Sequence, residues 1–244
     1  MNIDYSSSDK WTVKNLLRLR KFEIMMAGVD RSRIRFYDQT GFTGKDLLPK
    51  KVRKRKGGPD TTQKGKTTVS NVSLHTSVFG LTCLRTDKPA LWAQFYSSSS
   101  QNGQGSSEHV QFFKQAVAEG VLDRGDVVIL DNWSGHTSSE GEALRAWLRD
   151  AHDIVLVYLP AKFSHLNSIE HCWRTSKCWA RRARRGMPGL NPKAYMQVAC
   201  EGITHAEILR YMLHDGWGVE LSTRKEVLDR SYFPERPSSK KRKT

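Results

Sequence analysis

Two short, almost uninterrupted apolar segments constrain the fold of this 244-residue chain more than any other feature. They read DVVILD at 126–131 and IVLVYL at 154–159. A strand with one face in water alternates apolar and polar residues, whereas a strand covered on both faces is apolar throughout. Both segments are therefore predicted to be buried strands of a sheet that carries helices on its two faces.

Hydrophobic periodicity predicts the remaining elements around these two strands. Helix-like segments occupy 12–27, 108–120, 138–149, 167–185 and 192–213, and further strand-like segments occupy 33–38, 69–80 and 89–97. The order along the chain is one helix, three strands, and then helices that alternate with the two apolar strands. This order predicts an α/β fold in which a mixed five-stranded sheet is flanked by helices.

The formal net charge of +15 is concentrated in three basic segments. Residues 45–66, 168–185 and 235–244 carry net charges of +7, +5 and +4, so the rest of the chain is close to neutral. A single basic run is often only a solvated loop or tail. Three such runs on a nearly neutral body favour a polyanionic partner, with nucleic acid ahead of an acidic membrane surface.

The same sequence argues against several classes of function. No apolar run approaches the roughly 18 residues of a membrane span, so no membrane is expected among the partners. No G-x-x-x-x-G-K-[ST] loop is present, and neither ATP nor another small-molecule cofactor is expected. Zinc is not expected either, because the histidines and cysteines between 165 and 178 lack the paired spacings of zinc ligands.

Two short basic strings resemble nuclear import signals. They are PKKVRKRK at 49–56 and KKRK at 240–243, and such strings also occur by chance in basic proteins. The four cysteines are too few for a disulfide scaffold and fit a reducing compartment. A nuclear location is therefore expected if the organism is eukaryotic.

Three carboxylates stand where strands end or a helix begins. Asp38 and Asp131 each close a predicted strand, and Glu170 lies in the first turn of the helix expected at 167–185. Functional sites of open sheets gather at the carboxyl ends of strands. Carboxylates that meet there would make a hard-oxygen site for Mg²⁺ or Mn²⁺. Taken singly, each has an ordinary alternative as a turn, cap or helix-dipole residue.

The residues around these carboxylates form three recognisable strings. FYDQTGF, LDNWSGHT and LPAKFSHLNSIEHCW surround Asp38, Asp131 and Glu170, in that order. Together they resemble the catalytic domain of mariner-type transposases of the DDE superfamily, over about residues 12–180. That family carries an Asp-Asp-Glu/Asp triad on a ribonuclease-H-like fold. Its motifs include Asp-Asn-x-x-x-His and Leu-Pro…Leu-Asn-Pro-Ile-Glu-x-x-Trp, with a Lys shortly after.

The resemblance implies a role for each matching position. Asp38, Asp131 and Glu170 would form the catalytic triad and bind two Mg²⁺ (or Mn²⁺) ions. The accessory positions of the family are matched by Asn132, His136, Asn167, Trp173 and Lys177. The expected partners are double-stranded DNA, at transposon ends and at a target, and a second copy of the chain in a homodimer.

The sequence also departs from the family pattern. Gln39 replaces the usual Glu, Ser168 replaces the usual Pro, and residues 162–165 differ from the common Tyr-Ser-Pro-Asp stretch. None of these changes removes a carboxylate of the triad. They leave the subfamily and the activity open.

The helix expected at 167–185 places basic residues on the same face as Glu170. At 100° per residue, its four basic residues on that face lie within about 40° of the glutamate; they are Arg174, Lys177, Arg181 and Arg184. The predicted DNA contacts are these four together with Lys50, Lys51, Arg53, Lys54, Arg55 and Lys56. The alternative is an ordinary amphipathic helix whose basic face is solvated.

Three parts of the chain are expected. Residues 1–30 would be an N-terminal helix and linker, 31–215 the ribonuclease-H-like catalytic domain with its basic loop at 45–66, and 216–244 a C-terminal extension with a basic tail. The expected function is a metal-dependent transposase or endonuclease that hydrolyses phosphodiesters at transposon ends and transfers the strands into target DNA.

Two other hypotheses stay open at this point. The first is a domesticated or truncated relative that binds nucleic acid in the nucleus without catalysis. Its motivation is that a single predicted helix precedes Asp38, where family members normally carry helix-turn-helix domains. The second is a structure-selective nuclease of the same fold, which would cut branched or hybrid substrates.

Overall fold

The structure, a computed structural model, describes residues 12–47, 75–98, 106–132, 139–187, 189 and 191–217. At its centre lies one sheet of five strands in the order β3-β2-β1-β4-β5. The strands are β1 (Ile34–Phe42), β2 (His75–Thr82), β3 (Leu91–Ser98), β4 (Val127–Leu130) and β5 (Val155–Tyr158). The first three are antiparallel neighbours, whereas β1, β4 and β5 run parallel, so the sheet is mixed as predicted.

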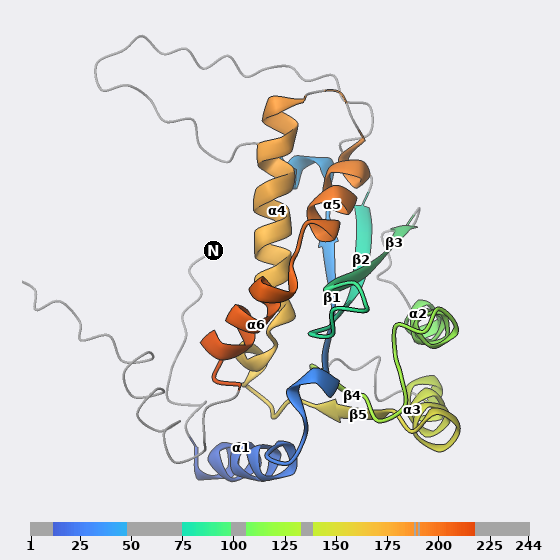
Figure 1. Cartoon of the computed structure of the whole chain (residues 1–244), viewed down its shortest axis with the longest axis vertical. Helices are drawn as coiled ribbons and strands as arrows, with labels where there is room; N and C mark the ends of the chain where they lie inside the picture. Colours follow the sequence, from blue (N-terminus) through green and yellow to red (C-terminus); the bar gives the residue numbers. More distant parts are fainter. Residues whose placement is uncertain are drawn as a thin grey trace, which may run out of the picture.

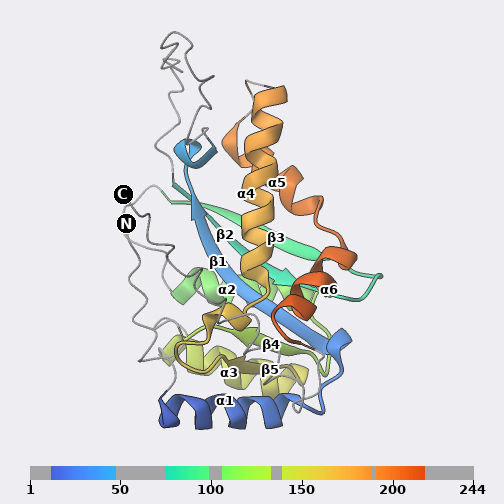
Figure 2. The same cartoon turned by 90° about the vertical axis from the view of Figure 1, so that its left-hand side faces the viewer.

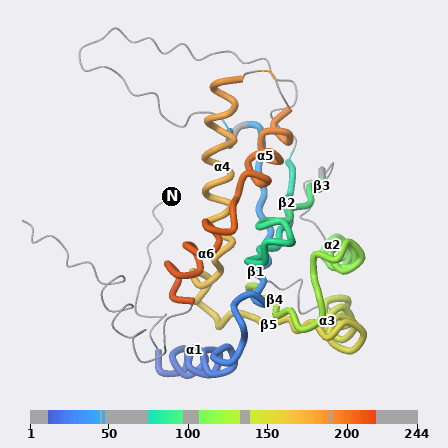
Figure 3. Tube along the Cα trace, viewed as in Figure 1, coloured from blue at the N-terminus to red at the C-terminus, as the bar shows by residue number. Residues whose placement is uncertain are grey.

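Helices cover both faces of the sheet (Figure 1). They are α1 (Val13–Met26), α2 (Ser106–Ala118), α3 (Ser139–His152), α4 (Ile169–Gly186), α5 (Pro192–Glu201) and α6 (His205–His214). Helices α2 and α3 lie on one face; α4 crosses β1 and β2 on the other (Figure 2), with α5 and α6 beside it (Figure 3). No helix in the described residues is long and apolar enough to cross a membrane.

The alternation of side chains along β1 separates two hydrophobic cores. Phe36 faces the α4 side, where its ring lies 5.1 Å from that of Trp217. Tyr37 faces the α2 and α3 side, with its ring 4.9 Å from that of Phe113. Successive side chains of a strand point to opposite faces. Asp38, the next residue, therefore returns to the α4 side.

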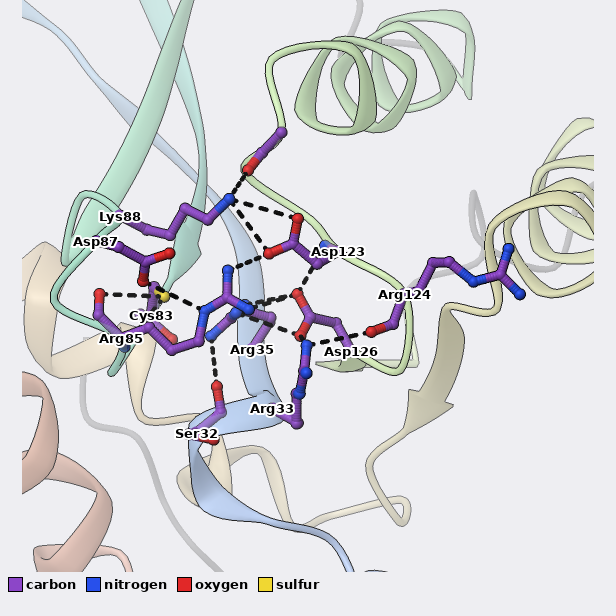
Figure 4. A network of polar contacts seen from close by, with 12 residues as sticks. Ser32, Arg33, Arg35, Cys83, Arg85, Asp87, Lys88, Asp123, Arg124 and Asp126 are labelled. Carbon is purple, nitrogen blue, oxygen red and sulfur yellow. Dashed lines mark hydrogen bonds and ion pairs between the residues drawn. The ribbon is translucent and has the colours of Figure 1, made fainter.

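A buried ion pair joins the first residues of β1 to the start of β4 (Figure 4). Nε of Arg35 donates to Oδ2 of Asp126 at 3.1 Å, and both side chains are fully buried. The guanidinium also donates to the backbone oxygen of Ser32 at 3.0 Å. The backbone N–H of Asp123 donates to the same Asp126 carboxylate at 3.0 Å. The pair thus fixes two neighbouring strands at the edge of the sheet where both begin.

Most of the predicted elements are confirmed, and the clearest differences concern the last predicted helix and β1. The helix expected at 192–213 is two helices, because Gly202 caps the end of α5 and Thr204 caps the start of α6. The side chains and backbone of Thr204 and Glu207 bond reciprocally in a capping box, which starts a helix. Strand β1 runs on to Phe42 instead of ending at Asp38.

Some predictions fall outside what the structure describes. These are residues 48–66 of the basic loop, 69–74 of the second predicted strand and the C-terminal basic tail. The three-part division at 1–30, 31–215 and 216–244 likewise stays a prediction.

Candidate active site

Asp38 and Asp131 occupy equivalent positions on neighbouring parallel strands. β1 pairs with β4 as far as Phe36, which is level with Ile129. Two residues further on, the same register brings Asp38 level with Asp131, immediately after β4. Since side chains alternate along a strand, both carboxylates lie on the side that α4 covers. Asp38 thus lies inside β1, which continues to Phe42, whereas Asp131 directly follows the last residue of β4. The site therefore lies at the carboxyl end of β4 and not at that of β1.

Glu170 joins these two residues from the first turn of α4, where its side chain is exposed. Burial raises the pKa of Asp38, and the negative charges of Glu170 and Asp131 raise it further, to about 8. Hydrogen bonds from the backbone of Gln39 and from Trp173 act in the opposite direction. The structure therefore brings Glu170 and Asp131 within electrostatic reach of Asp38.

Trp173 connects α4 to β1 through a hydrogen bond to Asp38. Its indole Nε1 donates a hydrogen bond of 3.0 Å to Oδ2 of Asp38. Gly80 is the β2 residue paired with Asp38, and a Cβ atom there would lie 2.5 Å from Cη2 of Trp173. Glycine thus makes room for the indole. Nδ2 of Asn167 adds a second tie, a hydrogen bond of 3.2 Å to the backbone oxygen of Tyr37.

Asn132 ties the end of β4 to the end of β5. Its Nδ2 donates to the backbone oxygen of Leu159, so the chain immediately after Asp131 is held in place. His136, the remaining accessory residue, lies outside the described residues, and its accessory role stays a prediction.

Lys177 lies two turns of α4 beyond Glu170 and points to the end of β1. Its Nζ donates to Oγ1 of Thr40 at 2.7 Å and to the backbone oxygen of Gly41 at 3.0 Å. Burial lowers the pKa of Lys177, whereas attraction to nearby carboxylates, including Glu170 and Asp38, opposes that shift. Lys177 therefore supplies positive charge beside the carboxylates while it holds β1 against α4.

The other basic residues of α4 differ in their contacts. Arg181 and Arg184 donate to backbone oxygens of η3 (Gly44–Leu47), the short 3-10 helix after β1, at 2.7 and 2.9 Å. Arg174 is exposed, with no hydrogen bond or ion pair found to the described residues. The basic face predicted for this helix is thus partly occupied by hydrogen bonds within the protein itself. DNA contact by these residues stays a prediction, as it does for Lys50–Lys56, which lie outside the described part.

The structure also contains a groove next to Asp131 that the sequence did not predict. It runs between α1 and the ends of β4 and β5, and Figures 1 and 2 both place α1 alongside β5. Its lining consists of Arg18, Lys21, Phe22, Met25, Asn132, Tyr158, Leu159, Pro160 and Ala161. The basic residues of α1 are plain in the sequence, but no pattern there indicates that this helix lies next to the carboxylates.

The carboxylate cluster has the donor atoms of a divalent-cation site. Carboxylate oxygens are hard ligands of the kind that Mg²⁺ and Mn²⁺ prefer. The mutual repulsion that helps to raise the pKa of Asp38 to about 8 is charge that a cation would neutralise. Asp38, Asp131 and Glu170 therefore fit such an ion, and the number of ions stays a prediction.

In the absence of divalent cations, Asp38→Asn should stabilise the protein at pH 8. The folded-state pKa of about 8 exceeds the ordinary value of 3.8, so wild-type stability falls as the pH rises from 3.8 towards 8. An amide has no such dependence. Thermal denaturation in EDTA should give a Tm gain of roughly 5–10 °C at pH 8 and almost none near pH 4. An equal gain in Tm at both pH values would mean that the pKa of Asp38 is not raised in the folded protein.

Comparisons with known proteins address the family and the fold. A family model described as DDE superfamily endonuclease matches residues 33–187. The structure of the Mos1 strand transfer complex is similar to this chain with a TM-score of 0.50 and 13% identity. The match covers 85% of this chain and 63% of that chain, and at this identity it concerns the fold alone. A search of curated proteins gave no match.

Two further solved structures are similar at lower scores. The catalytic domain of Mos1 mariner transposase has a TM-score of 0.44 and 10% identity, over 84% of this chain and 95% of that one. The catalytic core domain of BIV integrase has a TM-score of 0.42 and 15% identity, over 75% and 97%. This chain spans about 63% of the length of the Mos1 chain in the paired-end complex with the left transposon end.

Proposed function

Because this chain belongs to the DDE superfamily of endonucleases, we propose that it is a metal-dependent enzyme that cuts DNA at transposon ends and joins the freed strand to a target. The predicted resemblance and the ribonuclease-H-like fold are confirmed at the level of family and fold. One observation supports the proposal most strongly. The β1–β4 register brings Asp38 level with Asp131, and both share a charge-coupled site with Glu170.

Each residue of the site has a distinct part in the proposed chemistry. Divalent cations, when bound, supply activation of the attacking oxygen and stabilisation of the leaving one. Trp173 orients the Asp38 carboxylate through the bond to Oδ2, and Asn132 holds the backbone that carries Asp131. Lys177 adds positive charge near the reacting phosphate, where negative charge grows in the transition state.

Two successive displacements at phosphorus account for cutting and joining. In the first, the oxygen of water bonds to the phosphorus at a transposon end and the 3′-oxygen leaves as a hydroxyl. In the second, that 3′-hydroxyl attacks a target phosphodiester, and the target's own 3′-oxygen leaves. Neither displacement needs a covalent bond to the protein, so the chain supplies only position and electrostatics.

The surroundings of the carboxylates suit a DNA backbone. Arg18 and Lys21 line the groove on the Asp131 side, and the exposed Arg174 follows Glu170 on α4. Lysine and arginine side chains near phosphates give salt-sensitive affinity that does not depend on sequence. We propose that the duplex crosses the carboxylates with α1 on one side and α4 on the other.

The double variant Arg18→Ala/Lys21→Ala should weaken DNA binding and reduce its salt dependence. Each lost phosphate contact lowers the slope of log affinity against log salt by about one, so the expected change is about two. Fluorescence anisotropy of a labelled duplex over a salt series measures it. Lys114→Ala, an exposed lysine of α2 on the other face of the sheet, is the matched control and should bind as wild type. An unchanged slope in the double variant would place the DNA elsewhere.

A cleavage and joining assay tests the proposed activity. Duplexes from the genomic DNA on either side of the gene, where the proposal expects inverted repeats, are incubated with purified protein and supercoiled plasmid, in Mg²⁺, Mn²⁺ or EDTA. We expect strand cleavage at the repeat ends and joined products with either ion, and none in EDTA. DNA binding without cleavage in both ions would overturn the proposal in favour of a non-catalytic binding protein. Cleavage restricted to branched substrates would instead favour a structure-selective nuclease.

Two further features complete the proposal. A homodimer would provide one carboxylate cluster for each of two transposon ends, since the described part of one chain contains a single such cluster of Asp38, Asp131 and Glu170. A nuclear location in a eukaryotic host is supported by the basic strings at 49–56 and 240–243.

A further inference from the structure

A second cluster of potential metal ligands lies behind Glu170. It joins His171 of α4 to His214, the last residue of α6, and to Asp215 directly after it. One ligand atom from each of the three residues lies within 4.8 Å of the other two. The proposed DNA chemistry uses none of these side chains. In the sequence, the candidate co-ligands of His171 are its near neighbours in the chain, because nothing there indicates that α6 returns to the start of α4.

The distances within the cluster approach those of a coordinated ion. Nε2 of His171 and Nδ1 of His214 each lie 2.9 Å from Oδ1 of Asp215. A zinc ion bonds its ligands at about 2.0–2.2 Å, so tetrahedral ligand atoms stand about 3.3 Å apart. The side chain of His214 is 71% exposed, so its ring is free to move toward that spacing.

The surroundings hold the ligands in position. Oδ2 of Asp215, the oxygen that faces away from the histidines, accepts a hydrogen bond of 2.8 Å from Oγ of Ser168. The ring of His171 stacks on Tyr211, with the centroids 5.2 Å apart. Partners of this kind, which fix a ligand from behind, accompany most metal-binding residues. The buried carboxylate and the half-buried His171 are thus preorganised, whereas His214 is free to adjust.

We propose that His171, His214 and Asp215 bind Zn²⁺, with water at the fourth position. Two imidazoles and one carboxylate suit Zn²⁺ far better than Mg²⁺, which prefers oxygen ligands throughout. The ion would fasten the end of α6 to the first turn of α4, one residue from Glu170. This site is separate from the carboxylate cluster and does not rest on the proposed DNA chemistry.

Zinc binding by the purified, metal-free protein tests the proposal. Zn²⁺ is titrated against a chromophoric chelator in excess Mg²⁺, so that hard-oxygen sites are already filled. We expect one tight Zn²⁺ per chain, both in wild type and in Asp131→Asn, which weakens the carboxylate cluster. Co²⁺ in place of Zn²⁺ should give the visible absorption bands of a tetrahedral site.

Variants of the cluster separate this site from other zinc-binding positions. His214→Ala, at an exposed side chain, should lower the affinity by at least about 100-fold, and Ser168→Ala by about 10-fold because it removes an outer partner. His152→Ala, a histidine of α3 on the other face, is the matched control and should bind as wild type. Circular dichroism confirms that each variant is folded.

Two results would overturn the proposal. One is a wild-type protein that takes up no stoichiometric Zn²⁺ in excess Mg²⁺, which would leave the cluster as a carboxylate hydrogen-bonded by two histidines. The other is a folded His214→Ala variant with wild-type affinity. Either result leaves the DNA-cleaving proposal untouched, because that proposal is tested in Mg²⁺ or Mn²⁺ alone.

Discussion

Asp131→Asn should lower metal-dependent DNA cleavage by at least about 1,000-fold, a loss of about 4 kcal/mol of transition-state stabilisation. Asp131 stands level with Asp38 at the end of β4, and its charge contributes to the raised pKa of that neighbour. An amide in its place removes a negative ligand but keeps the side chain's size. Nicking of a plasmid or of an end duplex in Mg²⁺ and in Mn²⁺ measures the effect.

The matched control is Asp153→Asn, an exposed aspartate just before β5 whose backbone φ of 55° an asparagine also adopts readily. It should cleave DNA as wild type does. A second variant, Glu170→Gln, should behave like Asp131→Asn. If Asp131→Asn nicked DNA at the wild-type rate while folded, the assigned triad would be wrong.

Asp126→Ala should destabilise the fold by about 3–5 kcal/mol, the largest effect on stability that we expect from a single change. Its carboxylate is the fully buried partner of Arg35 and also accepts the backbone N–H of Asp123. Without it, a buried guanidinium would be left uncompensated. Urea denaturation monitored by tryptophan fluorescence gives the free energy of unfolding.

Asp150→Ala is the control for this change, because Asp150 forms an exposed pair with Arg149 and should leave stability almost unchanged. The double variant Arg35→Met/Asp126→Leu removes both charges and should regain much of the lost stability. A mild effect of Asp126→Ala, close to that of the control, would mean that water reaches the guanidinium.

The sequence predicted much of this fold because its strongest signals are local. The two apolar segments are buried strands, as their composition predicted, and the buried residues of α4 include Trp173 and Ala180. Asp131 closes β4, so its position followed directly from the end of the apolar run. Asp38 was misplaced within its strand, because the length of β1 is set by pairing with β2, which periodicity does not report.

What the sequence could not predict depends on packing between distant elements. The groove of Arg18 and Lys21 exists because α1 lies beside β5, and His171 meets Asp215 because α6 turns back to α4. The division of 192–213 into α5 and α6 did have a local signal. Thr204 and Glu207 stand three residues apart in the spacing of a capping box, but the apolar pattern ran through them.

The β1–β4 register also bears on how this protein can evolve. Side chains of a strand alternate with a period of two, so inserting or deleting one residue between Arg35 and Asp38 would turn a carboxylate of the proposed triad to the opposite face. The same holds for one residue between Asp126 and Asp131. The buried ion pair between Arg35 and Asp126 fixes the start of both stretches, so neither strand can shift along the other to compensate for the change in length. Active relatives should therefore vary in length in the connections and keep these two intervals constant.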